Sequence, residues 1–466
     1  MDAHPTATHE KALALNFDKS KYGTIAEIGA GQEVARWFFV VGGAAGTVAK
    51  TISAYDMAVS DSLYGRAPRY VSRQRLQAML EYEFSQLLEG LGDTRGPTTT
   101  FFAFADTVAT RGYRRAEDGR GWMGIRFQRS PGEPPSDVVV HVNLKDRTAR
   151  LQQETLGIVG VNLIYGVYHL HADPLTLIAS LMDELSRDRV EVDMIKLSGP
   201  AFDGVDNRLM SLQLVEQGLT DAAMFTAAGE VVQPSEVLYK RPILVERGSF
   251  RPVTKLTLDL LEGAREQFVA EPEVKGQEPV VLMEMTLRNL ARGDTVDHAD
   301  FLARADLLRA LGHDVLISRF EQYYQLAEYL AAYTDRLIGL AVGLPSIAEI
   351  ADERYYEALS GGALEATGRL FKRSLKMYVY PQLDAATGRV MTIETLPVKA
   401  GWEHLRNYLL ESGRLQPIRR YDEHLLSIFT HDVLARIESG NPAWETMVPA
   451  VVAATIKAQR LFGVRA

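Results

Sequence analysis

Three cationic side chains, Arg247, Arg251 and Lys255, lie within nine residues near the middle of the chain. Ser249 and Thr254 add hydroxyl groups to the same stretch. Guanidinium, ammonium and hydroxyl groups beside free backbone N–H groups are suited to holding an anion, above all a phosphate. The spacing therefore predicts a phosphate-binding turn, in which the three cations neutralise the charge of the ligand.

The elements expected on either side of this turn would position it at a sheet edge. Residues 242–245 form an apolar run typical of a short buried strand. In residues 254–268, large apolar side chains recur at helical spacing. Ligands of open α/β sheets bind outside the carboxyl ends of strands, and the start of a helix attracts negative charge. We therefore expect an anion at this strand–turn–helix junction.

The turn also carries a family resemblance. Residues 248–254, GSFRPVT, resemble the G-x-F-x-P-x-[H/T] signature that opens nucleotidyltransferases of the nicotinate/nicotinamide-mononucleotide adenylyltransferase kind. The chain as a whole resembles an uncharacterised bacterial family often described as adenylyltransferase-like. The resemblance implies an α/β fold that binds ATP and a pyridine mononucleotide. It also implies that the loop residues Gly248, Ser249, Phe250 and Thr254 cradle the ATP phosphates.

Two interpretations of the turn follow. In the first, the phosphate of a mononucleotide attacks the α-phosphorus of ATP, while Arg247, Arg251, Lys255 and a Mg²⁺ ion neutralise charge. Enzymes of this family have a phosphate-holding histidine three residues after the motif, where this chain has Thr257. That difference favours the second interpretation, a catalytically silent α/β protein that binds a nucleotide or another anion, or that acts through assembly.

Composition limits the classes of function. The chain has 466 residues, a net charge of −9 and no cysteine. The acidic balance argues against general nucleic-acid binding, which needs a clustered basic face. Without cysteine, disulfides, thiolate metal sites and cysteine nucleophiles are excluded. No signal peptide or membrane-spanning run is predicted, so we expect a cytoplasmic protein without a membrane partner. The expected substrate is a small-molecule nucleotide, and no nucleic-acid partner is expected. A homo-oligomer is compatible with the sequence.

Strands and helices alternate along most of the chain, which predicts an α/β fold with mostly parallel sheets and flanking helices. A shift in composition near residues 229–240 predicts two Rossmann-like domains, at residues 1–235 and 236–466, of which the second contains the motif. Residues 111–135 are rich in glycine, proline and charge, and we expect a surface loop or hairpin there with a strand over 122–127. The other predicted strands are 98–107, 138–144, 190–197, 222–225, 280–285, 314–318, 337–342 and 376–381.

Two glycine-bearing stretches near the start of the chain suggest further sites. Residues 27–31, EIGAG, resemble the E-x-G-x-G opening of S-adenosylmethionine-dependent methyltransferases. Residues 42–51 superficially resemble a phosphate loop but lack its lysine and threonine at the required spacing. The alternative for both stretches is close packing of small residues between a helix and a sheet, and we favour it.

Several polar clusters remain as weaker candidates. His169 and His171 could ligate a metal ion together only from a strand or loop, and no metal motif accompanies them. Asp203 and Asp206 follow a strand and could hold Mg²⁺ through water, although a helix cap is the alternative for Asp206. Residues 145–154 also follow a strand, and there solvated charge at a helix start is the alternative to a site. No serine–histidine–aspartate order or G-x-S-x-G elbow occurs.

Overall fold

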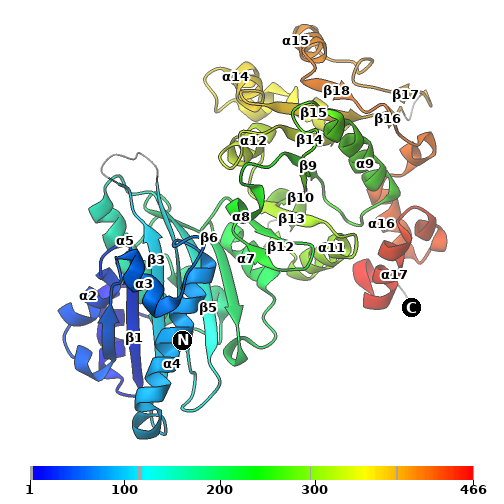
Figure 1. The fold of residues 1–466 in the computed structure, drawn as a ribbon. Helices are drawn as coiled ribbons and strands as arrows, with labels where there is room; N and C mark the ends of the chain where they lie inside the picture. Colours follow the sequence, from blue (N-terminus) through cyan, green and yellow to red (C-terminus); the bar gives the residue numbers. More distant parts are fainter. Residues whose placement is uncertain (1–3, 113–117, 294, 385–386, 465–466) are drawn as a thin grey trace. The chain divides into compact units, whose positions relative to one another are not determined.

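A computed structural model describes residues 4–112, 118–293, 295–384 and 387–464. The chain divides into two compact units, Met1–Asp221 and Ala222–Ala466. Each unit is built around its own large sheet (Figure 1).

The N-terminal unit combines a parallel half and an antiparallel half in one sheet. Its elements are α1 (Thr8–Phe17), β1 (Lys21–Ile28), α2 (Glu33–Val40), β2 (Val48–Ile52), α3 (Met57–Tyr64), α4 (Arg73–Arg95), β3 (Thr100–Ala109), β4 (Gly119–Phe127), β5 (Ser136–Leu144), α5 (Ala149–His169), α6 (Pro174–Ser180), β6 (Val190–Ser198) and α7 (Asn207–Glu216), with short 3-10 turns at Ala44–Gly46 and Pro200–Phe202. The strand order is β2-β1-β3-β4-β5-β6. The strands β2, β1 and β3 run parallel, and β3 to β6 pair antiparallel.

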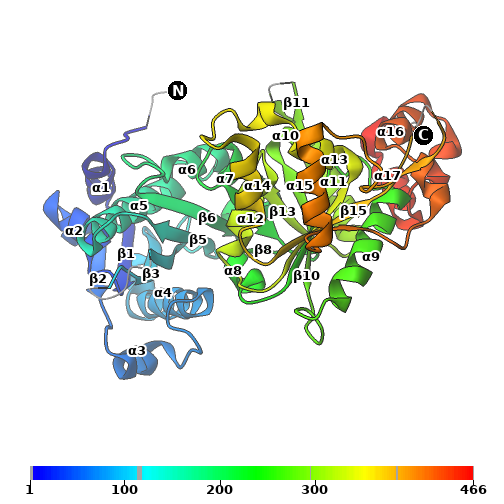
Figure 2. The same cartoon turned by 90° about the horizontal axis from the view of Figure 1, so that it is seen from above.

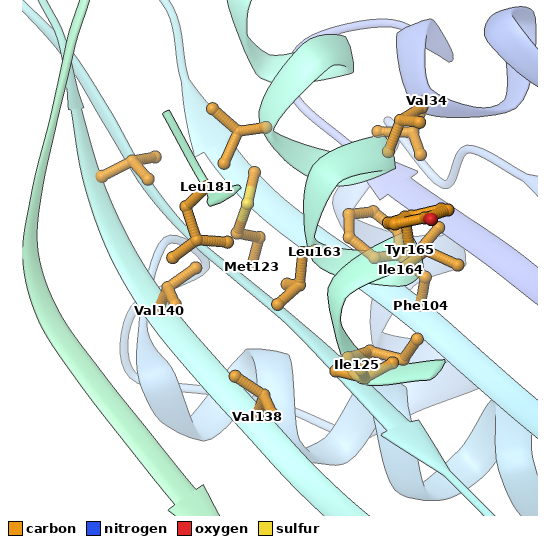
Figure 3. Close-up of a cluster of buried hydrophobic side chains, with 14 of the residues drawn as sticks. Val34, Phe104, Met123, Ile125, Val138, Val140, Leu163, Ile164, Tyr165 and Leu181 are labelled. Carbon is orange, nitrogen blue, oxygen red and sulfur yellow. The ribbon is translucent and has the colours of Figure 1, made fainter. Parts of the chain in front are cut away.

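The core of this unit lies between one face of the sheet and α5. Side chains that alternate along β4 and β5, such as Met123, Ile125 and Val140, meet Leu163 of α5 (Figure 3). A Cβ atom at Gly160 would lie 2.3 Å from Val34, so glycine lets α5 and α2 approach closely. Alternating apolar residues on the strands and an almost wholly apolar helix therefore account for this layer.

The C-terminal unit contains an eight-stranded sheet with two small hairpins beside it. Its elements are β7 (Ala222–Phe225), β8 (Val231–Val232), α8 (Pro234–Leu238), β9 (Ile243–Arg247), α9 (Lys255–Ala270), β10 (Val280–Thr286), α10 (Leu287–Leu290), β11 (Ala291–Arg292), β12 (Thr295–Val296), α11 (His298–Ala310), β13 (Asp314–Ser318), α12 (Tyr323–Ala331), β14 (Ile338–Gly343), α13 (Leu344–Ile350), η3 (Glu353–Tyr356), α14 (Gly362–Leu370), β15 (Leu375–Tyr380), β16 (Gln382–Leu383), β17 (Val390–Met391), α15 (Ala400–Glu411), β18 (Leu415–Pro417), η4 (Glu423–Ser427), α16 (Thr430–Ser439), η5 (Pro442–Thr446), α17 (Ala450–Gln459) and η6 (Leu461–Gly463).

The order of the parallel strands in this sheet is that of a Rossmann fold. The sheet reads β18-β15-β14-β9-β10-β13-β7-β8, and the strands from β18 to β13 are parallel. Numbered by their position in the chain, the strands from β13 to β18 follow the order 3-2-1-4-5-6. The order reverses between β9 and β14, so the carboxyl edge at these two strands is the topological switch point where ligands of such sheets bind.

Helices cover both faces of this sheet (Figure 2). On one face, Ile243 and Val245 of β9 belong to an apolar cluster with Leu326 of α12 and Leu370 of α14. The helix α9 packs on the other face. A Cβ atom at Gly339 of β14 would come within 2.8 Å of the ring of Phe268, which belongs to α9. The small residue on the strand therefore makes room for an aromatic ring on the helix.

The predicted α/β class is confirmed, with corrections in the N-terminal half. Its sheet is not mostly parallel, because successive strands from β3 to β6 form an antiparallel meander. The strand predicted over 122–127 within the stretch 111–135 is confirmed as part of β4, but β4 starts earlier, at Gly119, and is mostly buried rather than at the surface; residues 113–117 lie outside the described part of the chain. In the C-terminal half, β18 and α16 had not been predicted.

The division between the compact units falls at residues 221 and 222. The boundary predicted from composition, between residues 235 and 236, falls within α8. The C-terminal unit starts earlier because β7 pairs antiparallel with β13 and so extends the second sheet. Within the described ranges, none of the helices combines the length and apolar character that a membrane span requires.

Candidate functional site

The motif turn, residues 248–254, connects β9 to α9 at the switch point. Phe250, which the family resemblance places beside the ATP phosphates, is buried and has a φ of 49°. A Cβ atom at Gly248 would lie 2.8 Å from the ring of Phe250. The buried ring of Phe250 therefore leaves no room for a side chain at position 248, whether or not a ligand is bound.

Arg247 ends β9 and is held by an acid from the neighbouring strand. Its Nε and Nη2 donate to the two carboxylate oxygens of Glu284 on β10, at 2.7 and 2.9 Å. Its Cζ lies 4.5 Å from the ring centroid of Tyr323. Burial alone would lower the pKa of Arg247, but the charge of Glu284 and these hydrogen bonds raise it above the ordinary value. Arg247 is thus a charged group whose charge is already compensated.

Arg251 is also paired with a carboxylate, from α11. Its Nε donates to Oδ1 of Asp300 at 2.6 Å, and Nε of Arg304 donates to Oδ2 of the same carboxylate at 2.6 Å. Nη1 of Arg304 donates in addition to the carbonyl oxygen of Ser249 at 3.0 Å. Two guanidinium groups therefore share one carboxylate beneath the motif turn, and the charge of Asp297 also acts on Arg304.

The start of α9 makes most of its hydrogen bonds within the protein. Thr254 caps the helix by accepting the N–H of Thr257 at 3.2 Å, and the hydroxyl of Thr257 accepts the N–H of Thr254 at 3.4 Å. The N–H of Lys255 donates to the carbonyl oxygen of Met447 at 3.0 Å. The residue at the position of the family histidine therefore completes a capping box.

Two of the predicted ligand-binding groups face solvent. The side chains of Ser249 and Lys255 are exposed. Lys255 stands at the first position of α9, where the helix dipole also favours an anion. Of the predicted site residues, these two have side chains that are open to a ligand without loss of an existing ion pair.

Residues from other strands complete the carboxyl edge. Tyr323, which follows β13, donates its hydroxyl to Ser346, which follows β14, at 3.0 Å. Arg288, which follows β10, lies with its Cζ 6.0 Å from the ring centroid of Tyr355, which follows β14. Because β9 and β10 separate β14 from β13 in the sheet, these contacts cross the switch point.

Glu246 is a buried acid that forms no ion pair among the described residues. It lies on β9 immediately before Arg247, and its Oε2 has no hydrogen-bond partner among the described residues. Burial raises its pKa well above the ordinary value for a glutamic acid. A neutral carboxyl group in the central strand is the state that this environment favours.

The weaker candidate sites have structural roles. Asp206 caps α7 and bonds to Arg208. His169 stacks on Tyr165 with ring centroids 4.3 Å apart, and burial lowers its pKa. Within the described ranges, no group of three or more histidines, aspartates or glutamates is placed to hold a metal ion.

The glycine turn after β1 lies beside two buried acids. Glu27 on β1 and Asp106 on β3 are neighbours in the sheet register, and both are buried. Glu27 accepts the N–H groups of Val34 and Ala35 at the start of α2, at 2.9 and 3.1 Å. Oδ2 of Asp106 has no partner among the described residues. This glutamate therefore caps a helix, and a Cβ atom at Gly29 would lie 1.8 Å from the carbonyl oxygen of Val108, which is the close packing expected for residues 27–31.

Comparisons with known proteins identify no family. No family model matches the sequence, and none of the curated proteins matches it. Among solved structures, the chain is similar to the competence/damage-inducible protein CihA from Agrobacterium tumefaciens, at 15% identity over 35% of this chain and 97% of that chain, with a TM-score of 0.25. It is also similar to a CinA superfamily protein from Enterobacter cloacae, at 13% identity over 35% of this chain and 94% of that chain, with a TM-score of 0.25. TM-scores this low assign neither a family nor a function to the chain.

Proposed function

We propose that the protein binds a nucleotide through its phosphates at the carboxyl edge of the C-terminal sheet, over the end of β9. The observation that carries this proposal is the reversal of strand order between β9 and β14, with the motif turn directly after β9. In sheets of this order, the first strand–helix turn at the switch point is where phosphates bind.

The charges at this edge favour binding rather than catalysis. Lys255 and Ser249 offer an ammonium and a hydroxyl group that are open to solvent. Arg247 and Arg251, in contrast, would have to leave Glu284 and Asp300 before they could neutralise a transition state. Separating a buried ion pair is costly because each charge is left without its partner.

Adenylyl transfer to a pyridine mononucleotide is the second candidate. It is favoured by the position of the G-x-F-x-P-x-T signature, which lies in the first strand–helix turn of a Rossmann-type sheet. In this reaction ATP and Mg²⁺ would be bound by the motif turn, with Arg251 and Lys255 closest to the phosphates.

Calorimetric titration with ATP and Mg²⁺ tests the binding site. We expect wild-type protein to bind, and Lys255→Ala to weaken binding about tenfold, as the loss of one charge-assisted hydrogen bond predicts. Lys275→Ala, which removes another exposed lysine after the carboxyl end of α9, is the matched control and should bind like wild type. No binding by wild type, or equal losses in both variants, would contradict the proposed site.

A pyrophosphate assay separates the two candidates. Wild-type protein is incubated with ATP, Mg²⁺ and nicotinate or nicotinamide mononucleotide. The binding proposal predicts no pyrophosphate above the level without protein. Release that is abolished in Arg251→Ala would instead establish adenylyl transfer.

A further inference from the structure

The segment from Thr430 to Gly463, which we call the cap, touches the motif turn and the start of α9. It contains α16, η5, α17 and η6. Figures 1 and 2 show α16 and α17 near α9 and α11, and α17 and η6 both contact α11. The cap therefore lies beside α9, which begins at the proposed site, and α11, whose Asp300 pairs with Arg251.

Groups of the cap occupy positions where an anion would bind. The carbonyl oxygen of Met447 accepts the N–H of Lys255, which is an anion-binding donor at the first turn of α9. The ring of Phe462 lies with its centroid 6.0 Å from Cζ of Arg251. An aromatic ring face attracts a cation, and a carbonyl oxygen accepts a hydrogen bond from an N–H group. Both groups of the cap can therefore take the place of an anionic ligand.

The last turn of the cap leaves a cavity beside Arg251. About 390 Å³ of space lies between Arg251, the acids Asp297, Asp300 and Glu438, and the residues Arg460 to Gly463. Arg460 and Phe462 have φ values of 55° and 52°. This left-handed conformation is disfavoured for residues other than glycine, so the turn carries strain that its contacts must offset.

We propose that the cap competes with an anionic ligand for the motif turn, and that binding of the ligand releases the cap. This inference rests on the proposed function, because it concerns access to the same site. In the closed form, Met447 and Phe462 contact Lys255 and Arg251. In the open form, the N–H of Lys255 and the face of Arg251 that Phe462 covers are exposed to phosphate, Arg251 keeps its ion pair with Asp300, and the strained turn relaxes.

Titration of the full chain with ATP and Mg²⁺ tests the competition. Phe462→Ala removes the ring that contacts Arg251 and should raise ATP affinity at least about threefold, because the closed form loses a contact that the open form lacks. Phe39→Ala, an exposed phenylalanine of the N-terminal unit, is the control and should leave affinity unchanged. Circular dichroism of each variant checks that it is folded.

Hydrogen exchange of wild-type protein gives a readout that does not depend on the variant. ATP with Mg²⁺ should speed amide exchange in residues 450–463, because the cap is released. Slower exchange there, or equal affinity of wild type and Phe462→Ala, would overturn the competition while leaving the proposed function intact. If neither wild type nor Phe462→Ala binds ATP, the proposed function fails and the competition fails with it.

Discussion

The guanidinium of Arg247 lies between the carboxylate of Glu284 and the ring of Tyr323, with little contact with solvent. The sequence identifies this arginine as a cation near a strand end, but not its partner. Glu284 lies 37 positions along the chain, and only the pairing of β9 with β10 brings the two side chains together. The glutamate within this apolar strand could have indicated a buried ion pair, because buried acids are usually paired.

Glu284→Ala should destabilise the C-terminal unit by about 3–5 kcal/mol, because it leaves Arg247 buried without its counter-charge. Glu266 forms an ion pair with Arg420 that is well exposed. Glu266→Ala is therefore the control and should change the free energy of unfolding by less than about 0.5 kcal/mol. Urea denaturation measures both changes. A small loss in Glu284→Ala would show that the ion pair contributes little.

The buried pair of Glu27 and Asp106 predicts a pH dependence of stability. Burial raises the pKa of Glu27 to about 7, and burial together with the charge of Glu27 raises that of Asp106. In the unfolded chain both acids return to about 4. The folded protein therefore keeps a proton that the unfolded chain loses. The contribution of these two acids to the free energy of unfolding is therefore largest below about pH 4 and is lost as the pH rises through about 7.

Asp106→Asn should reduce this dependence and leave the part that comes from the burial of Glu27 itself. It replaces an unpartnered carboxylate oxygen with an uncharged group, and should raise the free energy of unfolding at pH 8 by about 1–3 kcal/mol. Asp93→Asn, at an exposed position of α4, should leave the pH profile unchanged. Thermal unfolding between pH 4 and pH 8 provides the comparison. A wild-type profile that is flat over this range would contradict the shared burial of the two acids.

At the level of elements, α9 begins with a capping box that the sequence only partly predicts. Thr254 was expected to face an anion, whereas its hydroxyl accepts the N–H of Thr257. Thr254→Ala should therefore cost about 0.5–2 kcal/mol of stability in the absence of any ligand. Thr94→Ala, at an exposed position near the end of α4, should cost much less. Equal costs would show that the cap of α9 does not stabilise the unit.

Some elements could be predicted from local patterns and others could not. The strands β10, β13 and β14 were predicted because each is a short apolar run next to a helical pattern. In contrast, only residues 122–127 of β4 were predicted, because its start at Gly119 lies in a stretch rich in glycine and charge and depends on pairing with β3 and β5. Short β18 is likewise defined by its pairing with β15 rather than by its own sequence.

At the level of the whole molecule, the C-terminal unit depends on residues 222–235. The strand β7 pairs with β13, which would otherwise be an edge strand with open backbone groups. A fragment of residues 222–466 should unfold cooperatively and remain monomeric at concentrations where a fragment of residues 236–466 aggregates. Equal stability and solubility of the two fragments would place the boundary at 235, as composition alone predicts.

The central claim is that a nucleotide binds over the carboxyl end of β9. A crystal structure of the wild-type protein with ATP and Mg²⁺, at concentrations that saturate binding in solution, tests it most directly. The account predicts phosphate density against Ser249 and the start of α9, within reach of Lys255, with the cap displaced from Arg251. Density at another edge of the sheet, or an unchanged motif turn in crystals of a protein that binds ATP in solution, would contradict it.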